Sequence, residues 1–571
     1  MMKLYRVLRE RLSDGDWRVI LESPYALGLV LLVVTVLSLS MMAAIQVGTW
    51  QDDATFILMA RALLEGKGMR LSYLVTEPVY PVVPVGYPIL LAPLVFLFPG
   101  SLLPLRLLST IFTLVTIVLV YRHARSRIGV RMALIIAGLV GTNMWVIYSG
   151  AQVMSEAASL LAIMGGVLLV DRFVTLQEVR WYDMALMAIV IGLPVTLRYL
   201  GAPITAAFAL FILWRRRDRI AVYTVGIALV VFLFVNFGIG GEGVFHYYYR
   251  QLSGFLSRSQ NTTISTSTTS GFAGNILAKK YHDIAFLLTY SIPGVLIPFF
   301  EGPQVAALFE RLGLGFIPIL ALLAIDGLLI VGFIVQFRKW KQAAEWVVAF
   351  YAIALFLLPT NWETLASNYR YWIPLILFGY GYLLSGVQFF QQRLQKARHD
   401  GRALIRPGVV VLIFSLFMLA LNLGRNVQAI WMNPWRSRVP DLDIGTDWLE
   451  AHTDADDVVM VVDRVRGYAL YLDRPMLPHP RAIIDWETRI FYEEVGLSEE
   501  DIIAPNAFFD IIERFGVDYI FITPSRVPDR PLTWSTFVED ELLPTLELHS
   551  EQFDLVWESQ DSFTRVYAYQ P

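Results

Sequence analysis

The sequence predicts a polytopic α-helical membrane protein of about eleven transmembrane helices, followed by a small extracytoplasmic α/β domain. Three observations lead to this prediction. Of the 571 residues, 56% are hydrophobic and 17% are charged, whereas charged residues make up about a quarter of a soluble domain. Long apolar runs recur as far as residue 425, with basic residues gathered between them. Beyond residue 433 the apolar runs are short.

The composition also limits the function classes. The chain has no cysteine, which excludes disulfides, thiol nucleophiles and cysteine-ligated zinc. An extracytoplasmic domain without disulfides is more typical of bacteria. The net charge of −3 is near neutral and gives no reason to expect a nucleic-acid partner.

Eleven runs are apolar enough to be read as membrane spans, which need about 20 residues each. A polar, basic segment at 1–24 precedes the first run, so we expect a retained span and not a cleaved signal peptide. The expected spans are 25–47, 103–121, 131–149, 153–170, 181–197, 200–214, 220–238, 313–335, 344–359, 371–389 and 408–425.

The basic residues set the expected orientation, because lysine and arginine favour the cytoplasmic side. With eleven spans, every basic cluster falls on the side of the N-terminus, and 48–102, 239–312 and 426–571 fall outside. We therefore expect a multi-pass protein of the cell inner (cytoplasmic) membrane, with its membrane part at 25–425. The same parity makes the apolar pieces 87–98 and 284–300 interfacial or re-entrant helices.

The C-terminal region, 426–571, reads as a soluble α/β domain. Short apolar runs at 458–462, 519–523 and 566–569 are typical of strands. Ala507–Phe515 has a helical pattern that Gly516 ends.

The pair Asp52 and Asp53 follows the first span directly. One carboxylate there could act as a general base at the place where a lipid substrate meets water. The structural alternative is that the acids stabilise the positive end of an amphipathic helix at 54–64. The sequence leaves both readings open.

Other ionisable residues lie near the same membrane face. The first is Glu77, at the start of a proline-rich segment that runs to Tyr87 and Pro88. The others are Glu156, Arg198 with Tyr199, and Arg370 with Tyr371. Arginine binds phosphate in a bidentate manner, and a carboxylate activates a hydroxyl acceptor. The set suits a substrate with a phosphate leaving group, although arginine also reaches the interface for structural reasons.

In order and topology these pieces resemble the GT-C membrane glycosyltransferases. The resemblance is to the branch of protein O-mannosyltransferases and the lipid A aminoarabinose transferase (family 39-like). It rests first on the acidic pair and on three segments that are similar to motifs of the family. Residues 60–68 are similar to A-x-x-L-x-x-G-x-G, residues 84–93 to P-P-G-Y-P-L-L-L-A-P, and residues 368–374 to R-Y-x-x-P. Three shorter segments, 105–109, 154–156 and 197–199, follow in the same order as in the family.

The resemblance implies a GT-C-like fold and a polyprenyl-phosphate-linked sugar as donor. The catalytic part would be the membrane domain, 25–425. The acceptor would be a protein, a lipid or a cell-wall glycan, and the C-terminal domain would shape the acceptor entrance and carry no chemistry. Asp52 would take the acceptor proton, with Asp53 as second choice, in one inverting displacement. Substrate-binding candidates are Glu77, Tyr87, Glu156, Arg198, Tyr199, Arg370 and Tyr371. Metal use varies in this superfamily, and any divalent metal would fall to Asp52, Asp53 and Glu77.

Two other classes remain as alternatives. A lipid or sugar transporter, or a flippase, would place charges near the bilayer midplane and show broken helices related by an internal repeat. The chain shows no such repeat, and its ionisable residues gather at one face. A non-catalytic scaffold would keep the fold without the transfer.

Overall fold

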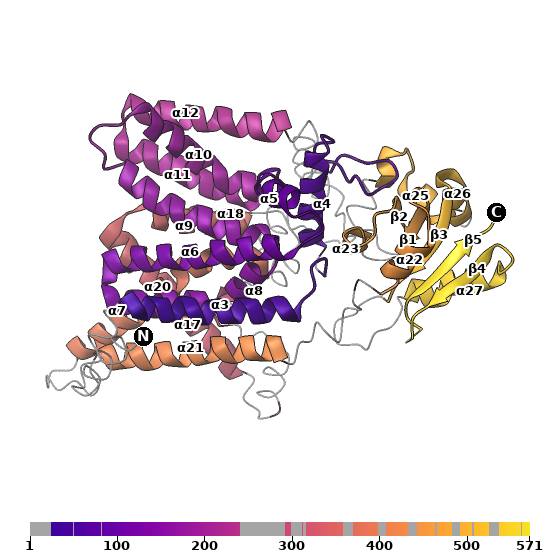
Figure 1. Cartoon of the computed structure of the whole chain (residues 1–571). Coiled ribbons are helices and arrows are strands. Elements are labelled where there is room, and N and C mark those ends of the chain that lie inside the picture. The colour runs from indigo at the N-terminus through magenta and orange to yellow at the C-terminus, as the bar shows by residue number, and fades with distance from the viewer. Residues whose placement is uncertain are drawn as a thin grey trace, which may run out of the picture.

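The computed structural model describes most of the chain. The described residues are 24–49, 51–80, 83–239, 292–297, 311, 316–357, 369–397, 407–431, 442, 444–462, 465–481, 491–504, 507–524, 536–560 and 562–571. They form a helical bundle and, at one end of it, an α/β domain (Figure 1).

A helix lies at each of the eleven expected spans. The helices are α3 (Pro24–Ala44), α6 (Leu103–Ile128), α7 (Val130–Thr142) with α8 (Met144–Ala151), α9 (Ser155–Phe173), α10 (Trp181–Leu197), α11 (Ala202–Arg216), α12 (Arg219–Leu233), α17 (Phe316–Trp340), α18 (Ala343–Leu357), α20 (Ile373–Ala397) and α21 (Pro407–Trp431). Within the described ranges, six helices are long and apolar enough to cross a membrane, or seven if α7 and α8 form one span. The membrane fold is therefore confirmed, and the count of eleven stays a prediction.

Helices α7 and α8 meet at Asn143 with a bend of 59°. The Asn143 side chain begins α8, because its Oδ1 accepts a hydrogen bond from the Trp145 amide at 3.0 Å. Its Nδ2 donates to the Val295 carbonyl at 2.8 Å and to Tyr380 Oη at 3.0 Å. One buried asparagine thus fixes the bend and ties it to α20.

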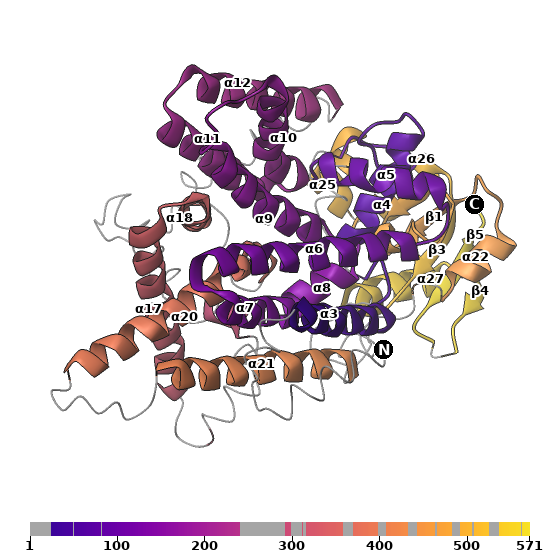
Figure 2. The same cartoon turned by 60° about the vertical axis from the view of Figure 1, so that its left-hand side comes forward.

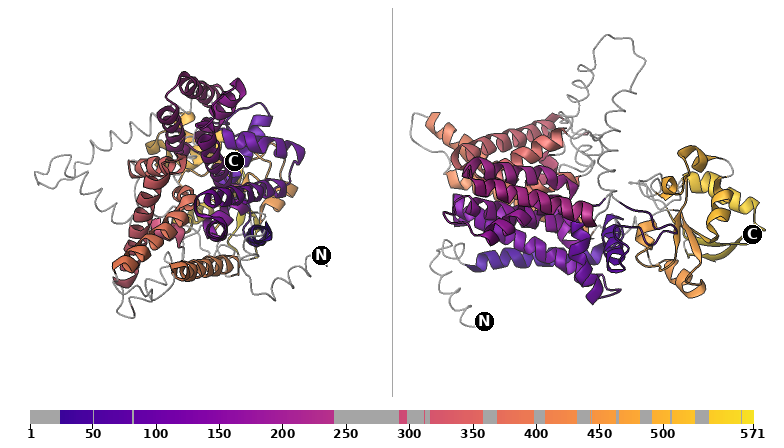
Figure 3. Two further views of the ribbon diagram at one scale, coloured as in Figure 1. Left: turned by 90° about the vertical axis from the view of Figure 1, so that its left-hand side faces the viewer. Right: turned by 90° about the horizontal axis from the view of Figure 1, so that it is seen from above.

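Basic residues occupy the last turns of α6, α11 and α17. These helix ends lie at the end of the bundle away from the α/β domain (Figures 1 and 3). At that end Arg127 of α6 pairs with Glu345 of α18, with 2.6 Å between Nη1 and Oε1. Both side chains are almost fully buried. Which side of the membrane this end faces stays a prediction.

Two short helices follow α3, as expected for the first loop. They are α4 (Asp52–Leu64) and α5 (Gly86–Leu97), and they lie between the bundle and the α/β domain (Figure 2). The α5 helix is apolar but has 12 residues, too few to cross a bilayer. Of the second expected interfacial piece, the structure describes only 292–297, where α15 (Ile292–Leu296) forms.

The C-terminal domain contains a five-stranded mixed sheet of order β2-β1-β3-β5-β4. Its strands are β1 (Val458–Val461), β2 (Met476–Pro478), β3 (Val517–Ile522), β4 (Phe553–Glu558) and β5 (Arg565–Tyr569). Parallel pairs join β1 to β2 and β3, and antiparallel pairs join β5 to β3 and β4. The described helices around the sheet are α22 (Thr446–His452), α23 (Val465–Tyr468), α25 (Glu499–Ile503), α26 (Ala507–Phe515) and α27 (Leu543–Leu548).

The predicted elements of this domain are confirmed, and two strands were not predicted. Helix α26 ends at Gly516, whose φ of +60° suits glycine. Strand β2 has three residues, the last of them Pro478. Strand β4 is largely exposed and lacks the alternation that marks a half-buried strand. Helix α21 also runs to Trp431, past the predicted end at 425.

The first loop and the C-terminal domain share one hydrophobic core. It runs without a break from Val47 and Leu71 of the loop to Val461 and Leu477 of the sheet. The loop also pairs with the edge strand β2, where the Met476 amide donates to the Tyr73 carbonyl at 2.8 Å. The domain is therefore packed onto the first loop, which protects a sheet edge that would otherwise be open.

Candidate functional site

Four charged side chains from distant parts of the chain form one cluster at the end of the bundle that faces the C-terminal domain. Arg370 lies in a helical turn, η5 (Tyr369–Tyr371), just before α20. Its Nη1 donates to Asp52 Oδ2 at 2.6 Å, and its Nε donates to Glu156 Oε1 at 2.5 Å. Arg198 Nη1 lies 3.1 Å from the same Glu156 oxygen. The structure thus brings together four of the residues that the sequence singled out.

Glu156 is the centre of this cluster. It lies in the first turn of α9, where the partial positive charge of the helix end favours a carboxylate. Its side chain is 2% exposed, and the two guanidinium groups compensate the buried charge. Its other oxygen, Oε2, is buried and accepts no hydrogen bond from the described residues.

Arg198 is placed by a close approach of two backbones. It directly follows α10, which ends at Leu197. A Cβ atom added to Gly86, at the start of α5, would lie 2.5 Å from the Thr196 carbonyl oxygen. Glycine is therefore the residue that lets α5 contact the end of α10, next to Arg198.

Asp52 and Asp53 have different surroundings. Asp53 is 0% exposed, and its carboxylate accepts hydrogen bonds from the amides of Gly48 at 2.8 Å and Ala54 at 3.0 Å. Burial raises the pKa of Asp53 to about 6. The Asp52 side chain is 38% exposed and faces guanidinium groups. Asp53 thus supports the start of α4, while Asp52 is accessible from solvent.

Arg466 is a site residue that sequence reasoning missed. It belongs to α23 of the C-terminal domain, and its Nη1 lies 3.8 Å from Asp52 Oδ1. The same nitrogen donates to Thr55 Oγ1 at 3.1 Å and to Tyr80 Oη at 3.4 Å. Its local sequence does not distinguish it from Arg474, and only the packing of the domain on the first loop places it here.

Glu77 and Tyr87 lie outside the cluster, and their expected substrate contacts stay predictions. Glu77 sits in a turn with φ of +48°, and its Oε1 accepts a hydrogen bond from Lys67 Nζ at 2.6 Å. Tyr87 is 0% exposed and packs edge-on against Phe56, with its Oη 3.3 Å from Ser109 Oγ. Tyr87 therefore holds α5 against α4 and α6.

Tyr199 and Tyr371 flank the two arginines of the cluster in the chain. Tyr199 begins the turn η1 (Tyr199–Gly201) and is partly buried. The carbonyl of Tyr371 accepts a hydrogen bond from Tyr351 Oη at 2.7 Å, which anchors the turn that carries Arg370. Substrate contacts of both tyrosines stay predictions.

The expected metal ligands do not converge. In the part of the chain that the structure describes, no group of three or more histidine, aspartate or glutamate residues could hold a metal ion. The oxygens of Asp53 are bonded to backbone amides, and Glu77 is paired with Lys67. Asp52, Asp53 and Glu77 therefore do not fit a metal site in this arrangement.

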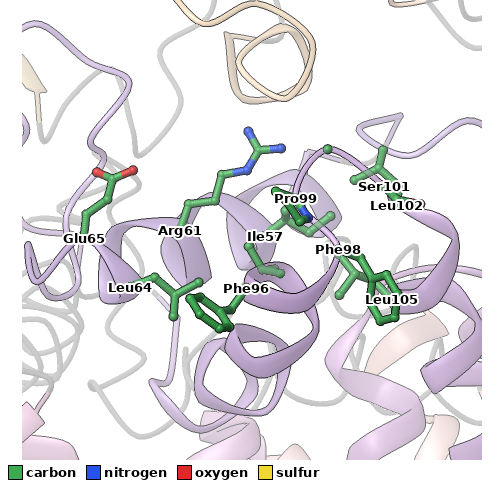
Figure 4. Close-up of a pocket in the computed structure, with 12 residues that line it drawn as sticks. Ile57, Arg61, Leu64, Glu65, Phe96, Phe98, Pro99, Ser101, Leu102 and Leu105 are labelled. Carbon is green, nitrogen blue, oxygen red and sulfur yellow. The ribbon is translucent and has the colours of Figure 1, made fainter.

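A separate cavity of about 300 Å³ opens between α4, the end of α5 and the start of α6 (Figure 4). Its walls are largely apolar, with Arg61 and Glu65 at the side of α4. It is lined by Ile57, Arg61, Leu64, Glu65, Val95, Phe96, Phe98, Pro99, Gly100, Ser101, Leu102 and Leu105. The charged cluster and this cavity share no residue.

Comparison with known proteins gives a family match for part of the chain. Residues 82–237 match a family model described as dolichyl-phosphate-mannose-protein mannosyltransferase. The matched segment contains Glu156 and Arg198. A comparison with curated proteins finds no match.

Solved membrane glycosyltransferases have a similar fold. ArnT from Cupriavidus metallidurans is 13% identical in its apo state, with a TM-score of 0.50 over 95% of this chain and 98% of that one. The same protein bound to undecaprenyl phosphate gives 14% identity and a TM-score of 0.50 over 95% and 97%. The Archaeoglobus fulgidus oligosaccharyltransferase tethered to an acceptor peptide is 13% identical, with a TM-score of 0.51 over 96% of this chain and 74% of that one.

Proposed function

We propose that this chain, which has the fold of the GT-C membrane glycosyltransferases, transfers a sugar from a polyprenyl-phosphate donor to an extracytoplasmic acceptor. The main support is the cluster of Asp52, Glu156, Arg198 and Arg370, which four separate segments build at one end of the bundle. The partial match to a mannosyltransferase family and the similarity to ArnT bound to undecaprenyl phosphate support the same reading.

In this proposal Arg198 and Arg370 bind the donor phosphate. Guanidinium groups pair with phosphate oxygens in a bidentate manner, and both arginines are held by one buried carboxylate, Glu156. Glu156 fixes their direction before substrate arrives, which lowers the cost of ordering them during binding. As the donor bond breaks, the same arginines stabilise the negative charge that develops on the leaving phosphate.

Asp52 is the proposed general base. In the free protein its carboxylate is paired with Arg370. A donor phosphate competes for Arg370 and so releases Asp52 for the acceptor. The acceptor oxygen then attacks the anomeric carbon, its proton passes to Asp52, and the carbon–oxygen bond to phosphate breaks with the electron pair leaving on phosphate. This single displacement inverts the anomeric configuration.

The position of the cluster fits a donor that stays in the bilayer. The cluster lies where the helix ends meet the first loop and the C-terminal domain. The lipid tail can remain among the apolar helices while the sugar reaches the exposed Asp52. The proposed side is the extracytoplasmic face of the inner membrane, and the acceptor is a protein, a lipid or a cell-wall glycan.

A transfer assay with a radiolabelled sugar on polyprenyl phosphate tests the proposal. We expect Asp52→Asn to fold normally and to lose at least about 100-fold in rate, the usual effect of removing a general base. Asp510→Asn is the matched control, because Asp510 is an exposed acid on α26. Wild-type protein that transfers no sugar from any such donor, or an Asp52→Asn variant at full rate, contradicts the proposal.

A further inference from the structure

We infer that the C-terminal domain completes the active site by supplying Arg466 as a positioning residue for Asp52. The inference rests on the proposed function above, because it takes Asp52 as the base. It assigns a role in the chemical step to a domain that was expected only to shape the acceptor entrance. The geometry around Asp52, the anchoring of Arg466 and the packing of the domain support it in turn.

Two cations face the Asp52 carboxylate, one at each oxygen. Arg370, from the membrane part, contacts Oδ2 at 2.6 Å. Arg466, from the C-terminal domain, lies 3.8 Å from Oδ1. When a donor phosphate draws Arg370 away, Arg466 still faces the carboxylate. The remaining cation keeps the Asp52 carboxylate in one orientation toward the acceptor.

Arg466 is itself held in place. Its residue is 9% exposed, and its guanidinium group lies over the Tyr80 ring at 6.0 Å from the ring centre. It donates to Thr55, which lies one helical turn after Asp52 on α4. A guanidinium group that is anchored on the same helix as the base can fix the base without a long, flexible reach.

The segment just before Asp52 is held closely by the domain. A Cβ added to Gly467 would lie 3.0 Å from the Gly48 carbonyl oxygen, so the two backbones nearly touch. Tyr471 Oη donates to the Val47 carbonyl at 2.9 Å, and the Leu442 amide donates to Gln46 Oε1 at 2.9 Å. Gly48 also donates to Asp53. The domain therefore sets the start of α4 as well as the charge beside it.

In this arrangement the loss of Arg466 affects kcat and the donor KM differently. The proposed phosphate ligands, Arg198 and Arg370, belong to the membrane part, so loss of Arg466 leaves donor binding unchanged. The proton acceptor is misplaced in the chemical step, and small misplacements of a reacting group cost up to about 100-fold. A fall in kcat at constant donor KM is therefore the expected signature.

The test measures steady-state transfer with the full-length chain. We expect Arg466→Gln to lower kcat about 10- to 100-fold at unchanged donor KM, and Arg466→Lys to recover most of the loss by restoring the charge. Arg474→Gln is the control, because Arg474 donates to Thr453 and Glu450 inside the domain. Thr55→Ala is a second variant, which removes one hydrogen-bond acceptor of Arg466 but keeps its contacts with Tyr80, and we expect it to lower kcat less.

Amide hydrogen exchange gives a readout that does not need activity. We expect Arg466→Gln to speed exchange at residues 48–56 and Arg474→Gln to leave it unchanged. Faster exchange in a chain without transferase activity supports the contact and refutes the proposed function. An active chain in which Arg466→Gln and Thr55→Ala both keep wild-type kcat refutes the role of Arg466 and leaves the proposed function standing.

Discussion

Successive side chains of an α-helix point about 100° apart, and this rotation separates Asp52 from Asp53. Asp53 turns toward Gly48 and is fully buried, whereas Asp52 turns toward Arg370 and Arg466. The structural reading of the acidic pair therefore fits Asp53, and the general-base reading is the one proposed for Asp52. The sequence could predict an acidic pair at the start of a helix. It could not assign the two roles, because partners more than 300 residues away decide which of the two carboxylates faces the cluster.

The buried carboxyl of Asp53 makes stability depend on pH. Its pKa is about 6 in the folded protein, and its ordinary value is 3.8. Between these values the folded state holds more protons than the unfolded state, so this group's contribution to stability falls as pH rises. Asp53→Asn lacks this dependence. We expect the difference in Tm, variant minus wild type, to increase from pH 4.5 to pH 7.5 in thermal unfolding of detergent-solubilised protein. A constant or shrinking difference contradicts the burial argument.

At the level of elements, the site is assembled from the ends of helices. Periodicity and span length predict α4, α5, α9, α10 and α20, and the parity of basic clusters predicts that their charged ends share one face. The structure confirms these helices and joins Glu156, Arg198 and Arg370. Glu77 lies outside the cluster because a turn with positive φ points it at Lys67, and periodicity does not predict such a turn. Tyr87 lies outside it because the buried face of α5 depends on its packing against α4 and α6.

The contact between α5 and α10 can be tested with one methyl group. In Gly86→Ala the new Cβ meets the Thr196 carbonyl, so the end of α10 and Arg198 must shift. We expect a loss of about 1–3 kcal/mol in stability, as for other overpacked sites, and a lower transfer rate. Gly192→Ala, on α10, is the matched control, because no atom lies within 4 Å of its added Cβ. Equal Tm and equal rates for both variants contradict the proposed contact.

At the scale of the molecule, the described residues form a helical bundle with a domain packed over the end that carries the charged cluster. One core joins the first loop to that domain, and the cluster of Asp52, Glu156, Arg198 and Arg370 lies beside this junction. Hydropathy and charge predicted the two parts and their order along the chain. The contact between them was not predictable, because it depends on the short strand β2, the close approach of Gly48 and Gly467, and the shape of a shared core. The arginine that the domain supplies was missed for the same reason.

The most direct test of the account is an experimental structure of the full chain with bound polyprenyl phosphate. We expect the phosphate to contact Arg198 and Arg370, with Glu156 still holding both arginines. We also expect the pair between Arg370 and Asp52 to be broken, with Asp52 left facing Arg466 and solvent. A phosphate bound elsewhere, for example beside Arg61, with the pair between Asp52 and Arg370 intact, contradicts the central claim.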